Sequence, residues 1–173
     1  MSSNHLTNRP FEESLPDFGV LVAESHHSRD FAMSARSHPF VKLIYVLEGS
    51  GKLEAQLKSR PFETGDVIII PPGLRHRIID SPEAPTSLYV ACLSLDLLHF
   101  DPSLAKQFRF TVLTDPHLTT RVAVTMRRMV YRQQSRDRGI SLAMATDSLR
   151  LIETILEPKT ARRKKVDRTS VSD

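Results

Sequence analysis

The sequence lacks the features that tie a chain to a membrane, a secretory route or a disulfide framework. Its 173 residues include a single cysteine, Cys92, which excludes an intrachain disulfide and a cysteine-rich zinc site. No apolar run approaches the roughly 20 residues that a membrane-spanning helix needs. The first residues are polar and are interrupted by Pro10 and Pro16, unlike a signal peptide. We therefore expect a cytoplasmic protein with no membrane partner.

The chain also lacks an excess of charge of one sign outside its C-terminal end. The formal net charge is +4 at pH 7. Residues 158–173 hold six basic and two acidic residues, so residues 1–157 carry 18 of each sign. The tail has no aromatic residue and no helical pattern, which is typical of a solvated linker; an arm that touches phosphates is the alternative. The rest of the chain has no electrostatic signature of a nucleic-acid-binding domain.

Short β-type runs separated by turn residues occupy the chain from about residue 18 to residue 95. Residues 31–38 and 52–58 alternate between apolar and polar side chains, which predicts strands with one buried face. Residues 40–47 are almost continuously apolar, which predicts a strand covered on both faces. About seven such runs without intervening helices indicate an antiparallel sandwich or barrel.

Two amphipathic helices are expected after residue 100. Asp115 and Pro116 form a helix start, because a capping carboxylate precedes a proline at the first helical position. The first helix is expected to end before Gly139 and the second to run over 141–156. Each carries an apolar stripe that must be buried against the barrel, the other helix or a partner chain: Leu118, Val122, Met126 and Met129 in the first, Leu142, Leu149, Ile152 and Leu156 in the second.

The most specific motif is GDVIIIPPGLRHRIID at residues 65–80. Gly65 allows a tight turn into a buried strand, the Pro-Pro-Gly at 71–73 reverses the chain, and His76 is then directed back toward the interior. This spacing resembles the second conserved motif of the cupin superfamily, in which the last position is usually Asn rather than Asp80. The resemblance implies a mainly β fold: a cupin (RmlC-like) jelly-roll β-barrel followed by the two amphipathic helices.

The first cupin motif should end in a glycine upstream of this segment, and Gly49 fits that place. Counting back from it places Lys42, His38 and Arg36 where the superfamily typically has Glu, His and His. These three residues and Phe40 share the same parity, so an extended chain directs them to one side. In a cupin that side is the barrel interior.

The substitutions in this motif decide which chemistry the barrel can support. A catalytic first-row metal needs three or more nitrogen or oxygen ligands, and only His38 and His76 remain, beside the cations Arg36 and Lys42. We expect no metal and no cofactor, with a metal on the two histidines as the weak alternative. The four residues instead predict a pocket for a small-molecule effector, such as a sugar, a sugar acid or a small carboxylate.

More conservative interpretations of the same residues stay open here. The two cations could pair with an internal acid such as Glu54 or Asp80, or extend to the barrel mouth. His76 could line a pocket or merely cap a strand. Cys92 is expected to pack as a small apolar group. The remaining histidines are expected at the surface: His5, His26, His27, His99 and His117.

A cupin with a degenerate first motif, two following helices and a basic linker is similar to the N-terminal sensing and dimerisation domain of AraC-type transcriptional regulators. The phrases SHPFVKLIYVLEGSGKLEAQ and LKSRPFETGDVIIIPPGLRHRI carry this resemblance, which covers about residues 18–157. It implies ligand sensing in the barrel, a homodimer through the C-terminal helices and an N-terminal arm that can close over the ligand. The expected parts are a flexible arm (1–16), the cupin barrel (17–100), a helical dimerisation segment (101–157) and a basic linker (158–173).

The resemblance predicts a transcription-regulation domain, similar to an arabinose-binding and dimerisation domain, that is not an enzyme. Such regulators read DNA through helix-turn-helix units, for which residues 158–173 are too short. We therefore expect DNA as a partner only through a helix-turn-helix domain that this chain lacks. One alternative is a stand-alone cupin enzyme or binding protein with an atypical site around His38 and His76. Another is a module that only dimerises, with its pocket filled by its own side chains.

Overall fold

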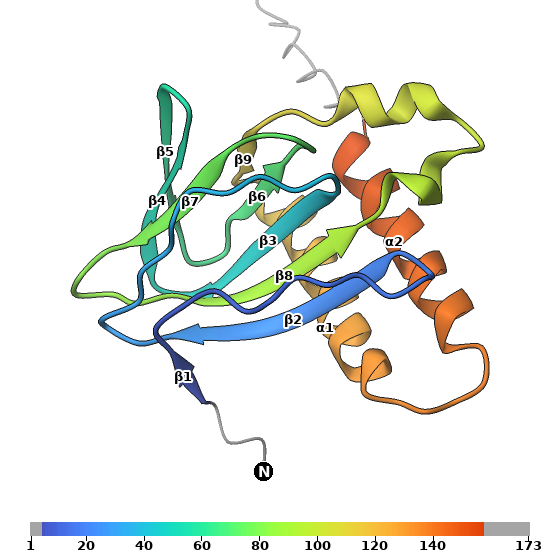
Figure 1. Cartoon of the computed structure of the whole chain (residues 1–173), viewed down its shortest axis with the longest axis horizontal. Coiled ribbons are helices and arrows are strands. Elements are labelled where there is room, and N and C mark those ends of the chain that lie inside the picture. The colour runs from blue at the N-terminus through green and yellow to red at the C-terminus, as the bar shows by residue number, and fades with distance from the viewer. Residues whose placement is uncertain (1–4, 158–173) are drawn as a thin grey trace, which may run out of the picture.

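The computed structural model describes residues 5–157, whose strands form two facing sheets followed by two helices (Figure 1). This is the predicted mainly β fold, a jelly roll with C-terminal helices. The expected basic linker (158–173) and the first four residues of the expected arm lie outside the described residues. The strands are β1 (Leu6–Thr7), β2 (Val20–His27), β3 (Val41–Glu48), β4 (Ser50–Ala55), β5 (Lys58–Glu63), β6 (Val67–Ile70), β7 (His76–Asp80), β8 (Ser87–Leu93) and β9 (Thr111–Leu113).

Six strands form one sheet in the order β1-β2-β8-β3-β6-β9, and the other three form a sheet in the order β5-β4-β7. Every pairing is antiparallel except that of β1 with β2. The helices are α1 (Pro116–Gln133) and α2 (Ile140–Leu156), preceded by the short 3-10 turns η1 (Leu95–Leu98) and η2 (Pro102–Gln107). Within the described part of the chain, no helix is long and apolar enough to cross a membrane.

The six-stranded sheet is the middle layer of the molecule, because each of its faces carries its own core. On β3, Val41 and Leu43 belong to the cluster that packs against the helices, while Ile44 and Val46 belong to the cluster shared with the three-stranded sheet. All four side chains are essentially inaccessible to solvent. This explains the almost continuous apolar run at 40–47, since neighbouring side chains on a strand face opposite sides.

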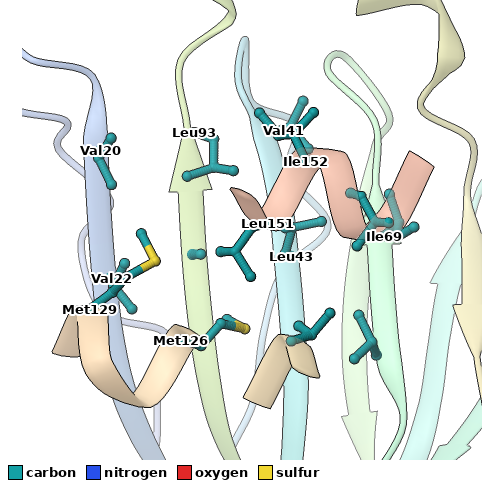
Figure 2. Packing of buried hydrophobic residues seen from close by; sticks show 14 of the residues in the cluster. Val20, Val22, Val41, Leu43, Ile69, Leu93, Met126, Met129, Leu151 and Ile152 are labelled. Carbon is teal, nitrogen blue, oxygen red and sulfur yellow. The ribbon is translucent and has the colours of Figure 1, made fainter. Parts of the chain in front are cut away.

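Helix α1 buries the stripe that its sequence predicts. Val122, Met126 and Met129 are fully buried, and Figure 2 shows Met126 and Met129 lying over β2 and β8 of the sheet. Asp115 caps the helix by accepting a hydrogen bond from the backbone N–H of His117 at 2.9 Å. The cap and the proline after it fix the start of the helix where the sequence indicates.

Helix α2 buries only half of its predicted stripe: Ile152 is buried and Leu156 packs partly buried against the same core, but the other two leucines do not. Leu142 and Leu149 are 72% and 37% exposed, whereas Met144, Leu151 and Ile155 are buried. At about 100° per residue these three side chains lie almost directly above one another, and the two leucines lie on the opposite side of the helix. The sequence of α2 thus carries two apolar faces. Figure 2 shows that the face containing Leu151 packs on the sheet.

A buried carboxylate joins the two helices. Asp147 of α2 has no solvent exposure and accepts hydrogen bonds from Arg128 and Arg132 of α1 at 2.8 and 2.9 Å. The two arginine side chains remain 38% and 41% exposed. Their aliphatic stems therefore cover the acid while their charged ends stay partly in water.

The end of α1 also binds the edge of the six-stranded sheet. The side-chain amide of Gln133 accepts a hydrogen bond from the backbone N–H of Val22 at 2.8 Å and donates one to the carbonyl oxygen of Val22. Because β1 pairs only with His26 and His27, the edge of β2 that faces away from β8 has no partner strand at Val22. The amide thus occupies the positions that a neighbouring strand would use.

The sheet extends past the boundary at residue 100 that the sequence predicts. Strand β9 pairs with β6 inside the segment expected to be helical, with Ile68 opposite Val112. Three residues are too few to produce a recognisable alternating pattern, which is why the sequence gives no signal for this strand.

Candidate functional site

The four predicted site residues lie close together inside the barrel. Lys42 is on the inner face of β3 and His76 begins β7. Arg36 is paired with His76 through two backbone hydrogen bonds of 2.9 Å. The rings of His38 and His76 are 5.8 Å apart between centroids. The spacing of the two cupin-like motifs therefore brings these residues together, whatever they bind.

The segment before β3 is not the alternating strand that the sequence predicts. Between Ser28 and Phe40 the chain pairs with a strand only at Arg36. The reason is topological: here the chain leaves the six-stranded sheet at the end of β2, touches β7 of the other sheet and then returns to begin β3. A crossing of this kind allows one residue to pair and leaves the rest irregular.

The acid that faces these residues comes from the N-terminal arm. The carboxylate of Glu13 contacts the ammonium of Lys42 through Oε1, and its Oε2 lies 2.7 Å from Nε2 of His38. The guanidinium of Arg36 is 3.7 Å from the same carboxylate. The side chain of Glu13 is only 3% exposed. A buried carboxylate thus partly neutralises the two cations.

The position of Glu13 follows from an alternating pattern in the arm. Phe11 and Leu15 pack against the core between the sheets, while Glu12 and Ser14 are exposed. An extended chain directs every second side chain to the same face, so Glu13 enters the barrel between its two apolar neighbours. The sequence FEESL contains this signal, although two apolar residues alone do not predict a strand.

Neither internal acid considered from the sequence pairs with the site cations. Glu54 lies on the outer side of the three-stranded sheet, 2.9 Å from Lys52 and 2.7 Å from Arg77. Asp80 instead accepts hydrogen bonds from Thr86, through both its hydroxyl and its backbone N–H, and pairs with His27 at 2.8 Å.

His27 is a further pocket residue that the sequence analysis placed at the surface. It is buried, stacks on Phe31 with ring centroids 3.4 Å apart, and lines the pocket beside Met33. The SHHSRD segment looked like a polar turn, but β2 continues through His27. Its parity matches that of Leu21, which packs in the core between the sheets, so its side chain points inward.

Burial and charge together set the protonation of the site. Burial lowers the pKa of Lys42, and Glu13 opposes that shift. Burial also lowers the pKa of His38, with the nearby Lys42 adding to the effect. Burial raises the pKa of the neighbouring Cys92 to about 12, so the thiol stays protonated and packs as an apolar group. The negative charge in the pocket is therefore that of Glu13.

His76 is neutral and presents an unpaired nitrogen. Burial lowers its pKa to about 4. Its Nδ1 lies 2.9 Å from the carbonyl oxygen of Leu74, which can only accept, so Nδ1 carries the proton. Nε2 is then a bare acceptor, buried without a hydrogen-bond partner, and Nε of Arg36 is buried and unsatisfied as well. Buried polar atoms without partners are costly, and a bound ligand could satisfy them.

Very little space remains in the barrel with the arm in place. The cavity beside Glu13, Arg36 and Lys42 measures about 20 Å³. A larger hollow of about 710 Å³ lies outside the barrel, between η2 and α2, and its walls are mainly apolar. The barrel is the candidate site, because it is the place within residues 5–157 where buried charged groups and unsatisfied polar atoms converge.

The residues at the cupin metal position do not fit a divalent metal ion. His38 and His76 are present, but the ammonium of Lys42 lies 3.3 Å from Nε2 of His38 and would repel the ion. Among residues 5–157, no group of three or more His, Cys, Asp or Glu side chains is arranged to hold a metal. The residues at this position therefore do not support chemistry on a bound metal.

Comparisons with known proteins agree with this fold. The AraC-like transcriptional activator CuxR has a similar structure, with a TM-score of 0.56 and 13% sequence identity over 81% of this chain and 52% of that one. This chain thus spans about half the length of the CuxR structure, and at this identity the likeness shows the fold alone. An RmlC-like cupin from Shewanella frigidimarina aligns with 44% of this chain and 67% of its own, at 16% identity and a TM-score of 0.40.

No curated protein sequence matches the chain significantly. The model of the family described as AraC-like ligand binding domain matches residues 18–146, which include the barrel strands from β2 onward, all of α1 and the first part of α2. The chain therefore belongs to the AraC-like ligand-binding domain family.

Proposed function

We propose that this chain is the small-molecule-sensing and dimerisation domain of an AraC-type transcription regulator, that it acts in the cytoplasm, and that it is not an enzyme. The observation that carries the proposal is the pair of cations Lys42, which is buried, and Arg36, which is 33% exposed; both contact the buried carboxylate of Glu13 inside a ligand-binding fold. Two cations in an apolar barrel need anionic partners, and Glu13 supplies a single negative charge. A carboxylate effector, such as a sugar acid, carries the same group that Glu13 presents to these cations.

The remaining groups of the site match such a ligand. Arg36 and Lys42 would bind its carboxylate through charge-assisted hydrogen bonds. The bare Nε2 of His76 would accept a hydrogen bond from a hydroxyl group of the ligand. Ligand binding can shift the domain between two arrangements only by the difference in its affinity for them.

A screen of sugar acids and small carboxylates by thermal shift, followed by calorimetry, tests the proposal. We expect a ligand of this class to raise the melting temperature of the wild type and Lys42→Met to weaken its binding at least tenfold. Lys52→Met is the matched control, because Lys52 is 48% exposed on the outer face of β4 and should have no effect. A ligand that binds Lys42→Met and Lys52→Met with equal affinity would show that its carboxylate does not bind at Lys42.

The small cavity favours a second candidate, a module that only dimerises and fills its pocket with its own side chains. The 20 Å³ that remain beside Glu13 are too small for a sugar. This candidate predicts that no carboxylate binds even when the carboxylate of Glu13 is removed, an outcome that the experiments below include.

A further inference from the structure

We infer that Glu13 is the chain's own occupant of the anion site, and that an effector carboxylate binds by displacing Glu13 and the arm that carries it. The inference rests on the proposed function, because it assumes that the barrel takes an external carboxylate. It goes further in stating what the effector must compete with.

The geometry of Glu13 is that of a bound carboxylate ligand. Its two oxygens face Lys42 and His38, and Arg36 approaches from the side. These are the same groups that would hold the carboxylate of an effector. Two carboxylates cannot share them, since the cavity of about 20 Å³ next to Glu13 has room for little more than one water molecule.

The arm is attached in a way that permits release. Its β1 strand is two residues long and pairs at one end of β2. Its carbonyl groups at Thr7 and Asn8 accept hydrogen bonds from the backbone N–H groups of Ser28 and Ala32. Beyond these contacts it is held by two half-buried apolar side chains, Phe11 and Leu15, and by the ion pairs of Glu13. An effector carboxylate that takes over those ion pairs leaves few buried contacts to hold the arm, and such segments open at a low free-energy cost.

This arrangement predicts that the arm leaves the barrel when the effector binds, and does not close over it. If the arm closed over the ligand, as the resemblance implies, the effector would increase the order of the arm. If the arm fills the site, the effector and the arm exclude each other and binding releases residues 5–15. Release of the arm would then be the structural change that signals a bound effector.

The first experiment removes the carboxylate of Glu13 in the full 173-residue chain and offers acetate in its place. Glu13→Ala vacates the anion site. Glu12→Ala is the matched control, because Glu12 is adjacent in the sequence and its side chain is exposed. Melting temperature and acetate binding are measured for the wild type and both variants, with chloride at equal ionic strength as the reference.

We expect Glu13→Ala to melt at a lower temperature than the wild type and acetate to restore part of the loss. Acetate should bind Glu13→Ala at least tenfold more tightly than it binds the wild type or Glu12→Ala. Equal acetate binding by all three proteins would overturn the inference while leaving the pocket intact. Acetate binding by none of them would overturn both the inference and the proposed function, and would favour the module that only dimerises.

A second experiment uses the wild type alone, so it does not depend on a variant that folds. Amide hydrogen exchange is followed by NMR with and without a high concentration of acetate. The N–H groups of Ser28 and Ala32 report on the arm, and that of Val46, bonded to the carbonyl oxygen of Asp66, reports on the barrel. Acetate should speed exchange of the first two at least threefold and leave Val46 unchanged. Unchanged or slower exchange at Ser28 and Ala32 would show that the arm is not displaced.

Discussion

Single residues decide whether the barrel interior is charged or neutral. Lys42 and Arg36 lie beside the carboxylate of Glu13, whereas the imidazole of His76 sits among them without a proton on Nε2. The site therefore combines an ion cluster with a neutral hydrogen-bond acceptor. That combination suits a ligand with both a carboxylate and a hydroxyl group better than it suits a simple anion.

The buried imidazole of His76 should make folding sensitive to acid. Burial lowers its pKa from 6.5 to about 4 in the folded protein, so the unfolded chain binds the proton first as the pH falls. The contribution of neutral His76 to the free energy of unfolding is fully present above pH 6.5. It is lost as the pH falls from 6.5 toward 4, by up to about 3 kcal/mol. Urea unfolding between pH 4 and 7.5 measures this slope.

His76→Asn is the informative variant, because an amide can keep the hydrogen bond to the carbonyl oxygen of Leu74 but does not titrate. Its slope between pH 4 and 6.5 should be clearly shallower than that of the wild type. Part of the slope should remain, because the pKa of His38 is also lowered in the folded protein and its titration changes stability in the same direction. The charged groups that face both imidazole rings are Lys42 and Glu13. An unchanged slope would mean that His76 is charged in the folded state.

Parity in the sequence places Arg36, His38 and Lys42 correctly on the interior side, but it does not identify their partner. Glu13 lies 29 residues before Lys42 in the sequence numbering, in an arm without a strand pattern, and only the folded chain brings the two together. His27 is missed for a related reason. Its polar neighbours suggest a turn, and nothing local shows that β2 continues to it.

At the level of elements, a buried acid links α1 to α2 in addition to their shared apolar core. Asp147→Asn should lower the free energy of unfolding by about 2 kcal/mol, because it removes the charge that orders Arg128 and Arg132. The loss of stability stays moderate, because both arginine side chains are partly exposed and can be hydrated. Glu157→Gln is the control: it weakens the exposed ion pair with Arg121 and should change stability little. Equal effects of the two variants in chemical unfolding would contradict this account.

The existence of both helices and the start of α1 could be predicted from the sequence, but the end of α1 and the orientation of α2 could not. Asp115 and Pro116 are local signals for the start of α1, whereas Gly139, expected to stop that helix, lies past its last residue, Gln133, and is the N-cap of α2. Which face of α2 is buried depends instead on what it packs against. Leu142 and Leu149 form as good a stripe as Leu151 and Ile155, and the contact with α1 and the sheet decides between them.

Across the whole molecule, the helix layer presents the apolar surface that a dimer would use. Leu142 and Leu149 of α2 and Val124 and Tyr131 of α1 are all exposed, each pair being two helical turns apart. The proposed dimerisation would place a second copy of this chain on these side chains. The sheets on the other side of the molecule offer no comparable row of exposed apolar side chains among residues 5–157.

Leu149→Glu should therefore weaken self-association at least tenfold, because it places a charge in an apolar contact. Sedimentation velocity over a concentration series would measure the dimer constant. Leu57→Glu is the matched control, since Leu57 is fully exposed at the turn between β4 and β5, away from the helices. A wild type that stays monomeric at high concentration, or a Leu149→Glu variant that still dimerises normally, would contradict this dimer face.

The Gln133 amide on the edge of β2 has a consequence for how copies of the chain can meet. A free strand edge invites another chain to add a strand, which is a common route to aggregation. Here the backbone of Val22 is already bonded by a side chain from α1. Sheet extension at this edge would first require the end of α1 to detach, so α1 protects this edge of the sheet from uncontrolled strand addition.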